Sequence, residues 1–173
     1  IDEVAKQSLK KGLELTSEQI DSLKQADTFE YTYAKLLNFL SYRPRTVKEV
    51  RDRLYKYKVK DKVKQDLLIE RLQSKGYLDD LKFTQWFIES RNAHRPRSPR
   101  MLTAELKTKG VSEEVIKSVI NEVTDETETI RHLLTKKLGV PHTLDQLTRQ
   151  KIYAYLGRQG FSWDKIKEVV KTW

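Results

Sequence analysis

Apolar residues recur along most of the chain with the three- and four-residue spacing of an α-helix. In 33–40 they lie at positions i, i+3, i+4 and i+7, and related spacings mark 63–72, 115–123 and 166–170. Few segments alternate apolar and polar residues as a half-buried strand does, and the chain holds only six glycines and four prolines. The pattern predicts an all-α protein made of short helices.

The sequence also repeats itself. The tetrapeptide Arg-Pro-Arg-Thr at 43–46 returns as Arg-Pro-Arg-Ser at 95–98, and the same shift of 52 residues aligns Val59 with Val111. In each copy a basic turn precedes a helix, a break follows at Gly or Lys, and another helix begins after an apolar residue. A period of this length is typical of proteins built from tandem helical units.

A third copy follows 50 residues later, where Gly110 aligns with Gly160 and Ile116 with Ile166. One more helix precedes each unit, at 31–42, 81–94 and roughly 126–138, so that every repeat is expected to hold three short helices. The sequence thus predicts an elongated array of three tandem three-helix repeats, each similar to a helix-turn-helix unit.

Composition and turn signals divide the chain into four parts. The expected boundaries give an N-terminal segment at 1–29 and three-helix repeats at 30–80, 81–124 and 125–173. Acidic residues outnumber basic ones in 1–29, in contrast to the rest of the chain, and Thr16 or Ser17 is expected to open a short helix there. Because the sequence opens at Ile1 rather than at a methionine, we expect part of the protein to precede it.

The distribution of charge adds a class of partner. Lys and Arg total 34 against 25 Asp and Glu, which gives a formal net charge of +9 and favours polyanions such as nucleic acid. The surplus gathers in the turn and second helix of each repeat, because eight basic residues oppose two acidic ones in 43–60 and six oppose one in 91–109. The candidates for binding DNA or a DNA–protein filament are Arg43, Arg45, Arg51, Arg53, Lys56, Lys58, Arg91, Arg95, Arg97, Arg100, Lys107, Lys109, Arg149, Lys151 and Arg158.

A run of charge on a single helix is more often a solvated face with ion pairs four residues apart. Recurrence at the same position in three repeats favours a binding surface, because a row of basic patches can follow the regular charges of a phosphate backbone. Four tyrosines interleave with these basic residues: Tyr55, Tyr57, Tyr153 and Tyr155. Stacking on unpaired bases is one interpretation of their rings. The favoured interpretation is that in each pair one ring is packed and the other is exposed.

The residue types needed for catalysis or metal binding are missing or badly spaced. The chain has no cysteine, and its three histidines, His94, His132 and His142, neither pair at ligand spacing nor adjoin an acidic cluster. No glycine-rich phosphate loop or G-x-S-x-G motif occurs, and Asp79-Asp80 is interpreted as the start of a helix rather than as a metal site. We therefore expect no catalytic residue, no metal and no cofactor. The lack of cysteine, of a signal peptide and of a long apolar run favours a cytoplasmic protein.

Several motifs, taken together in order and spacing, give the chain a family resemblance. They are the Arg-x-Arg-Ser/Thr turns, a Leu-x-x-Lys-Gly step before an apolar residue and a Gly-Tyr-Leu-Asp-Asp joint, at 43–46, 76–80, 91–98 and 109–111. With them, 30–173 resembles the RecX family of bacterial recombination regulators, and 1–29 resembles the segment that precedes its repeats. The third repeat departs from the pattern, because Pro141-His142-Thr143 and a longer second helix replace the Arg-x-Arg turn.

The resemblance implies a non-enzymatic protein that acts in the cytoplasm without a cofactor. RecX-like proteins bind the RecA recombinase and the filament that RecA forms on single-stranded DNA. They restrain its strand exchange, ATPase and coprotease activities, and they also bind DNA directly. We accordingly expect RecA and single-stranded DNA as partners of a monomer. Two other interpretations stay open: a helix-turn-helix repressor that recognises one duplex sequence, and a helical-repeat scaffold whose basic face binds acidic proteins.

Overall fold

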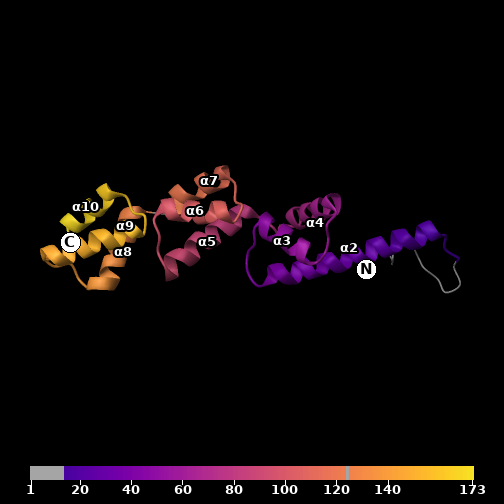
Figure 1. The fold of residues 1–173 in the computed structure, drawn as a ribbon, viewed down its shortest axis with the longest axis horizontal. Helices are drawn as coiled ribbons and strands as arrows, with labels where there is room; N and C mark the ends of the chain where they lie inside the picture. Colours follow the sequence, from indigo (N-terminus) through magenta and orange to yellow (C-terminus); the bar gives the residue numbers. More distant parts are fainter. Residues whose placement is uncertain (1–13, 124) are drawn as a thin grey trace. The chain divides into compact units, whose positions relative to one another are not determined.

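The computed structural model describes residues 14–123 and 125–173, without the side chains of 121–123. Every regular element within these residues is an α-helix, which confirms the predicted fold class (Figure 1). The helices are α2 (Ser17–Ser41), α3 (Val47–Lys56), α4 (Lys62–Ser74), α5 (Asp80–His94), α6 (Pro99–Thr108), α7 (Glu113–Val123), α8 (Glu126–Leu138), α9 (Gln146–Arg158) and α10 (Trp163–Lys171). The chain forms two compact units, one ending at Asp79 and the other beginning at Asp80. The first part of the predicted N-terminal segment, 1–13, and the predicted joint at residue 124 lie outside the described residues.

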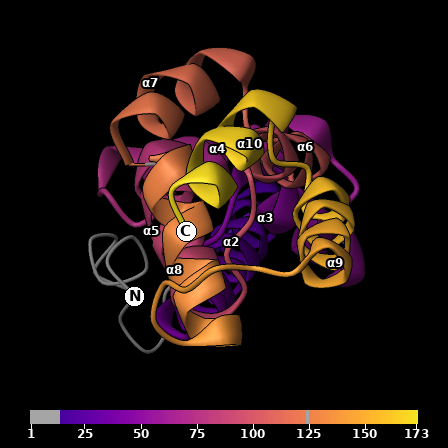
Figure 2. The ribbon, with the colours of Figure 1, turned by 90° about the vertical axis from the view of Figure 1, so that its left-hand side faces the viewer.

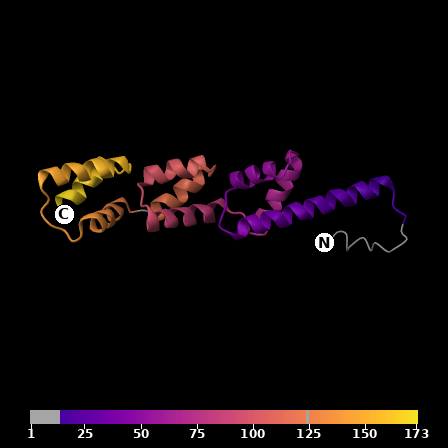
Figure 3. The same cartoon turned by 60° about the horizontal axis from the view of Figure 1, so that its bottom comes forward.

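Each repeat has a hydrophobic core of its own, built by three consecutive helices (Figure 3). In the first repeat the fully buried side chains from α2, α3 and α4 are Leu36, Val50, Leu54, Leu68 and Leu72. In the second repeat, α5, α6 and α7 bury Phe83, Ile88, Leu102, Leu106 and Ile116. The helices α8, α9 and α10 of the third repeat are seen in Figure 2. They bury Ile130, Leu134, Ile152, Leu156 and Val169. Three tandem three-helix repeats are therefore confirmed.

The first helix differs from the expectation of a short helix followed by a separate one. Thr16 caps α2 with a capping box, in which its hydroxyl accepts the Gln19 N–H at 3.3 Å and its own N–H donates to the Gln19 side chain at 2.9 Å. From this cap the helix runs unbroken to Ser41, because no glycine or proline interrupts it before Pro44. The segment predicted to stand apart thus continues directly into the first helix of the first repeat.

The second helix of every repeat ends in the same turn. Residues Val59, Val111 and Phe161 each donate their N–H to the carbonyl five residues earlier, at 3.1, 3.2 and 3.3 Å. The residue just before each donor adopts a left-handed backbone, with φ of 63° at Lys58 and 82° at both Gly110 and Gly160. This is the helix stop in which glycine is the usual residue. The turn places the third helix of each repeat against the second.

Candidate nucleic-acid interface

The basic turn of the first repeat is held together by its own residues. Thr46 is fully buried and caps α3 by accepting the Glu49 N–H at 3.1 Å. The guanidinium group of Arg43 donates two hydrogen bonds to the Glu49 carboxylate, at 3.0 and 2.9 Å. Such a two-pronged pair fixes geometry strongly. Arg43 therefore positions the start of α3.

Two other arginines of the first repeat lie on one aromatic ring. The guanidinium carbons of Arg45 and Arg53 lie 4.2 and 4.1 Å from the centroid of the Phe39 ring. Among the described residues, the Nε atom of Arg45 is buried without a hydrogen-bond partner. Burial lowers the pKa of Arg45 from its ordinary value, and the like charges of Arg43 and Arg53 lower it further. Together with Lys56 the pair lines a hollow of about 230 Å³, whose lining also includes the carboxylates of Glu49 and Asp52.

The corresponding turn of the second repeat uses different pairs. Ser98 is fully buried and caps α6 by accepting the Met101 N–H at 3.2 Å. Arg91 contacts the Glu105 carboxylate at 2.7 Å, and the Nε of Arg97 lies 4.0 Å from the same carboxylate. Arg97 also donates to the side-chain oxygen of Gln159 in the third repeat. These two arginines join elements of the second unit to one another.

In the third repeat an acidic residue, Asp145, caps the second helix, α9. Asp145 accepts the Thr148 N–H at 2.8 Å and the Thr148 hydroxyl at 2.6 Å, and these bonds lower the pKa of Asp145. The cap lies three residues before Thr148, the position that aligns with Ser98, so α9 gains nearly one turn relative to α6. This confirms the longer second helix expected of this repeat. It also places a negative charge at the end of the helix where the first two repeats carry arginine.

The structure separates the predicted basic residues into two groups. One group makes contacts within the protein: besides the arginines above, Arg51 pairs with Asp66 at 2.7 Å and Lys107 pairs with Glu113 at 3.1 Å, while Lys109 is partly buried near Phe87. The other group is exposed and has no ion pair within the described residues. It consists of Lys56, Lys58, Arg95, Arg100, Arg149, Lys151 and Arg158, which we name the exposed basic set. Its members lie on the second helices or on the turns beside them.

The tyrosines of the second helices follow the packing interpretation in the first repeat. Tyr55 is 58% exposed, whereas Tyr57 is partly buried against the core of that repeat. In the third repeat Tyr153 and Tyr155 both pack against the core, and the Tyr153 ring lies 4.9 Å from the Trp163 ring. The two repeats therefore differ in how much aromatic surface they expose.

One basic pocket was not predicted from the sequence. It lies between α2, α4 and the turn after α3, and its lining includes Tyr31, Lys35 and Lys64 besides the predicted Lys58. The missed residues belong to the first and third helices, where no excess of charge was expected. A signal was nevertheless present, because Lys58 stands where the other two repeats have glycine.

Neither a metal site nor a membrane span emerges from the described part of the chain. Within it, no three His, Cys, Asp or Glu residues come together as ligands for a metal ion. None of the helices described above combines the length and apolar character that crossing a bilayer requires.

Comparison with known proteins matches all three repeats to one family. The models of the first, second and third three-helix domains of RecX match residues 33–64, 79–120 and 124–170. Among solved structures, a crystal structure of regulatory protein RecX has a TM-score of 0.75 at 22% identity, covering 98% of this chain and 86% of the other. The crystal structure of RecX from Lactobacillus salivarius has a TM-score of 0.71 at 24% identity, covering 85% and 97%. At these identities the two structures support the fold.

Relatives known as Regulatory protein RecX match at higher identity. The one from Listeria monocytogenes serotype 4a is 35% identical over 98% of this chain and 62% of its own length. The one from Bacillus licheniformis is 32% identical over 99% and 66%, and the one from Oceanobacillus iheyensis is 36% identical over 75% and 48%. The chain thus spans about half to two thirds of the length of these relatives. With three matching domains in the same order and the same fold, the chain belongs to the RecX family of regulatory proteins.

Proposed function

We propose that this chain is a non-enzymatic regulator that binds the RecA recombinase and the filament RecA forms on single-stranded DNA. In this role it restrains the activities of RecA and contacts DNA directly through the basic patches of its repeats, acting as a monomer in the cytoplasm. One observation carries the proposal: in a RecX family member, the exposed basic set recurs on the second helices and turns of three tandem repeats.

The recurrence matters because a nucleoprotein filament is itself a repeating object. Each phosphate neutralised by Lys or Arg releases counterions, so affinity increases with the number of basic side chains that reach the backbone. Several weak contacts on one chain also strengthen each other, since the first contact raises the local concentration of the next. Exposed side chains without a carboxylate partner serve this purpose best, because no internal ion pair has to break.

The test compares two triple variants of equal charge. The first, Lys56→Glu with Arg95→Glu and Arg100→Glu, reverses exposed residues of second helices and turns. The control, Lys75→Glu with Arg131→Glu and Lys136→Glu, reverses exposed residues elsewhere. We expect the first variant to bind single-stranded DNA and RecA filaments at least tenfold more weakly than the control, and to lose inhibition of strand exchange.

Four results contradict the proposal. A wild-type chain that does not associate with RecA on single-stranded DNA in a pulldown contradicts filament binding. Equal losses in the two triple variants mean that net charge, rather than the second-helix patches, determines affinity. Strong preference for one duplex sequence over single strands identifies a repressor, and RecA-independent binding to acidic proteins without any DNA affinity identifies a scaffold.

A further inference from the structure

Lys58 has a backbone conformation that disfavours its side chain. It occupies the left-handed position at which the second and third repeats have Gly110 and Gly160, with φ of 63° against 82° for both glycines. In this region the Cβ atom of an L-residue crowds its own backbone, a cost that glycine avoids. The same turn forms in all three repeats, so the fold does not require lysine there. A strained lysine at a position that glycine fits suggests that the side chain of Lys58 has a role.

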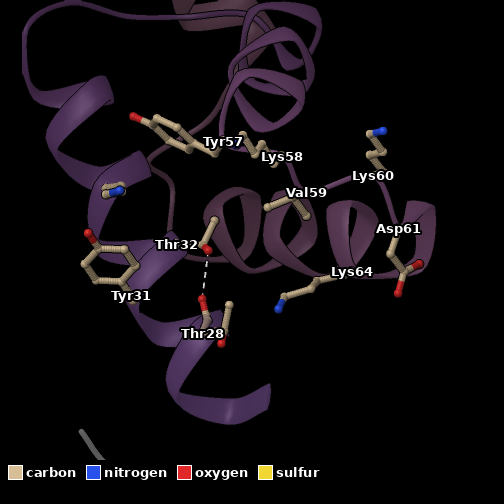
Figure 4. Close-up of a pocket in the computed structure, with 10 residues that line it drawn as sticks. Thr28, Tyr31, Thr32, Tyr57, Lys58, Val59, Lys60, Asp61 and Lys64 are labelled. Carbon is tan, nitrogen blue, oxygen red and sulfur yellow. Dashed lines mark hydrogen bonds between the residues drawn. The ribbon is translucent and has the colours of Figure 1, made fainter. Parts of the chain in front are cut away.

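The Lys58 side chain lines a basic and aromatic pocket of about 330 Å³ in the first unit (Figure 4). Figure 4 shows the Tyr31 and Tyr57 rings at one side of this pocket and the Lys64 side chain extending from α4. The Nζ atom of Lys35 lies near both rings, 4.3 Å from the Tyr31 centroid and 5.3 Å from the Tyr57 centroid. The Lys35 ammonium group thus lies close to both rings, and the pocket combines flat apolar surface with positive charge.

The positive charge of the pocket exceeds the negative charge within it. Its four lysines, at positions 35, 58, 60 and 64, make no ion pair within the described residues. The one carboxylate in the lining, Asp61, already accepts the Val63 N–H at 2.9 Å as the cap of α4. The hydroxyl groups of Thr28 and Thr32 donate to backbone carbonyls, at 2.7 Å each. The lysines are therefore the groups available to an incoming ligand, and they select an anion.

We propose that this pocket, the Tyr31–Lys58 pocket, binds one nucleotide of a single DNA strand. The phosphate lies among Lys35, Lys58 and Lys64, and the base stacks on the Tyr31 ring, which is 61% exposed. Aromatic platforms beside basic grooves are how proteins hold single strands, since an unpaired base presents its face whereas a duplex base is covered by its neighbours. The pocket adds residues of the first and third helices to the surface invoked above, and it rests on the direct DNA binding proposed there.

The strain at Lys58 supplies a test in which stability and binding change in opposite directions. Lys58→Gly relieves the left-handed backbone and removes one pocket cation, so we expect a higher unfolding midpoint and at least fivefold weaker binding of a thymidine oligonucleotide. Lys136→Gln, on exposed α8, is the matched loss of charge and is expected to change affinity less than twofold. Both are measured on the full chain by anisotropy of the labelled strand at one low salt concentration.

A second substitution tests the base rather than the phosphate. Tyr31→Leu keeps every lysine, so we expect it to weaken binding of the thymidine strand about threefold or more while leaving an abasic strand of the same length unaffected. Equal weakening on both strands overturns stacking at this ring. Lys58→Gly that binds as tightly as Lys136→Gln overturns the pocket altogether.

The outcomes distinguish this pocket from the broader function. If the Lys58→Gly and Tyr31→Leu variants bind single strands as tightly as the wild-type chain does, the nucleotide pocket is contradicted, whereas the proposal for the second-helix patches is not. If the wild-type chain binds neither DNA nor RecA filaments, both the broader function and the pocket are contradicted. If Lys58→Gly weakens a RecA pulldown without DNA but leaves DNA affinity intact, the occupant is an acidic protein segment and the nucleotide proposal is wrong.

Discussion

Gly160 lies where the turn between α9 and α10 meets the start of α6. A Cβ atom at this position would lie 2.6 Å from Met101 Cγ and 2.7 Å from Ser98 Oγ, and Ser98 is the buried cap of α6. Gly76 closes α4 with the same kind of turn, in which the Tyr77 N–H donates to the Leu72 carbonyl at 2.9 Å, and its φ is 71°. Among the described residues, nothing lies within 4 Å of the position of a Cβ atom at Gly76. The two glycines separate the effect of backbone strain from that of close packing.

We expect Gly160→Ala to destabilise the second unit more than Gly76→Ala destabilises the first. Left-handed alanine costs about 1–2 kcal/mol at either site, and overpacking against Met101 and Ser98 adds about 1–3 kcal/mol at Gly160. Chemical denaturation of both variants measures the difference in the free energy of unfolding. Equal losses would show that the contact between repeats adapts without cost.

The role of each arginine was the part of the site that the sequence could not supply. Position by position, the 52-residue shift aligns Glu49 with Met101 and Arg53 with Glu105. Arg43 therefore has a carboxylate to bind in the first repeat, while its counterpart Arg95 stays exposed in the second. The turn motif was visible in the sequence, but whether its first arginine is paired depends on one residue in the following helix.

At the scale of elements, a carboxylate joins the second and third helices of the second repeat. Glu113, in the first turn of α7, pairs with Lys107 of α6 at 3.1 Å and with Lys117 of its own helix at 2.8 Å. Hydrogen bonds from Lys117 and Lys107 lower the pKa of Glu113 to about 2. Since the folded-state pKa lies below the ordinary value of 4.5, the stabilising contribution of Glu113 is complete above that value.

We predict that this contribution disappears as the pH falls from 4.5 to 2. Glu113→Gln should lower the thermal midpoint at neutral pH, and the difference from wild type should shrink as acid protonates the wild-type carboxyl group. Glu114→Gln, an exposed neighbour without an ion pair in the described residues, is the control and should show no such trend. A difference for Glu113→Gln that is constant with pH would contradict the ion-pair origin.

The spacing of apolar residues predicted the existence of the helices more accurately than it predicted their ends. The first helices of the second and third repeats were expected at 81–94 and about 126–138, and α5 and α8 lie there. The length of α2 was missed because its first turns were interpreted as a separate short helix. Their apolar residues, such as Ile20 and Leu23, are not buried, and the buried residues of α2 begin only at Thr32. Those turns are helical because they are capped and lack a helix breaker, which are properties of local sequence rather than of core packing.

At the scale of the whole molecule, the number of phosphate contacts sets how affinity responds to salt. For single strands the logarithm of the affinity falls with the logarithm of salt concentration, with a slope of about −0.7 for each neutralised phosphate. Arg95→Gln with Arg100→Gln should therefore make the slope less steep by about 1.4 if both side chains of the exposed basic set contact phosphate.

The substitution Arg43→Gln should instead lower the free energy of unfolding by about 1–2 kcal/mol, because it leaves the Glu49 carboxylate without its two hydrogen bonds.

Strand length distinguishes a row of patches from a single dominant site. If all three repeats contact one strand, affinity should keep rising as the oligonucleotide grows, and each increment should vanish when the basic residues of one repeat are neutralised. Arg149→Gln with Lys151→Gln and Arg158→Gln tests the third repeat, whose acidic cap makes it the weakest candidate. We expect this triple variant to reduce affinity for long strands only, because short strands can occupy the first two repeats. Anisotropy titrations over a series of strand lengths measure both effects, and an equal loss on short and long strands would mean that the repeats do not act as successive contacts along one strand.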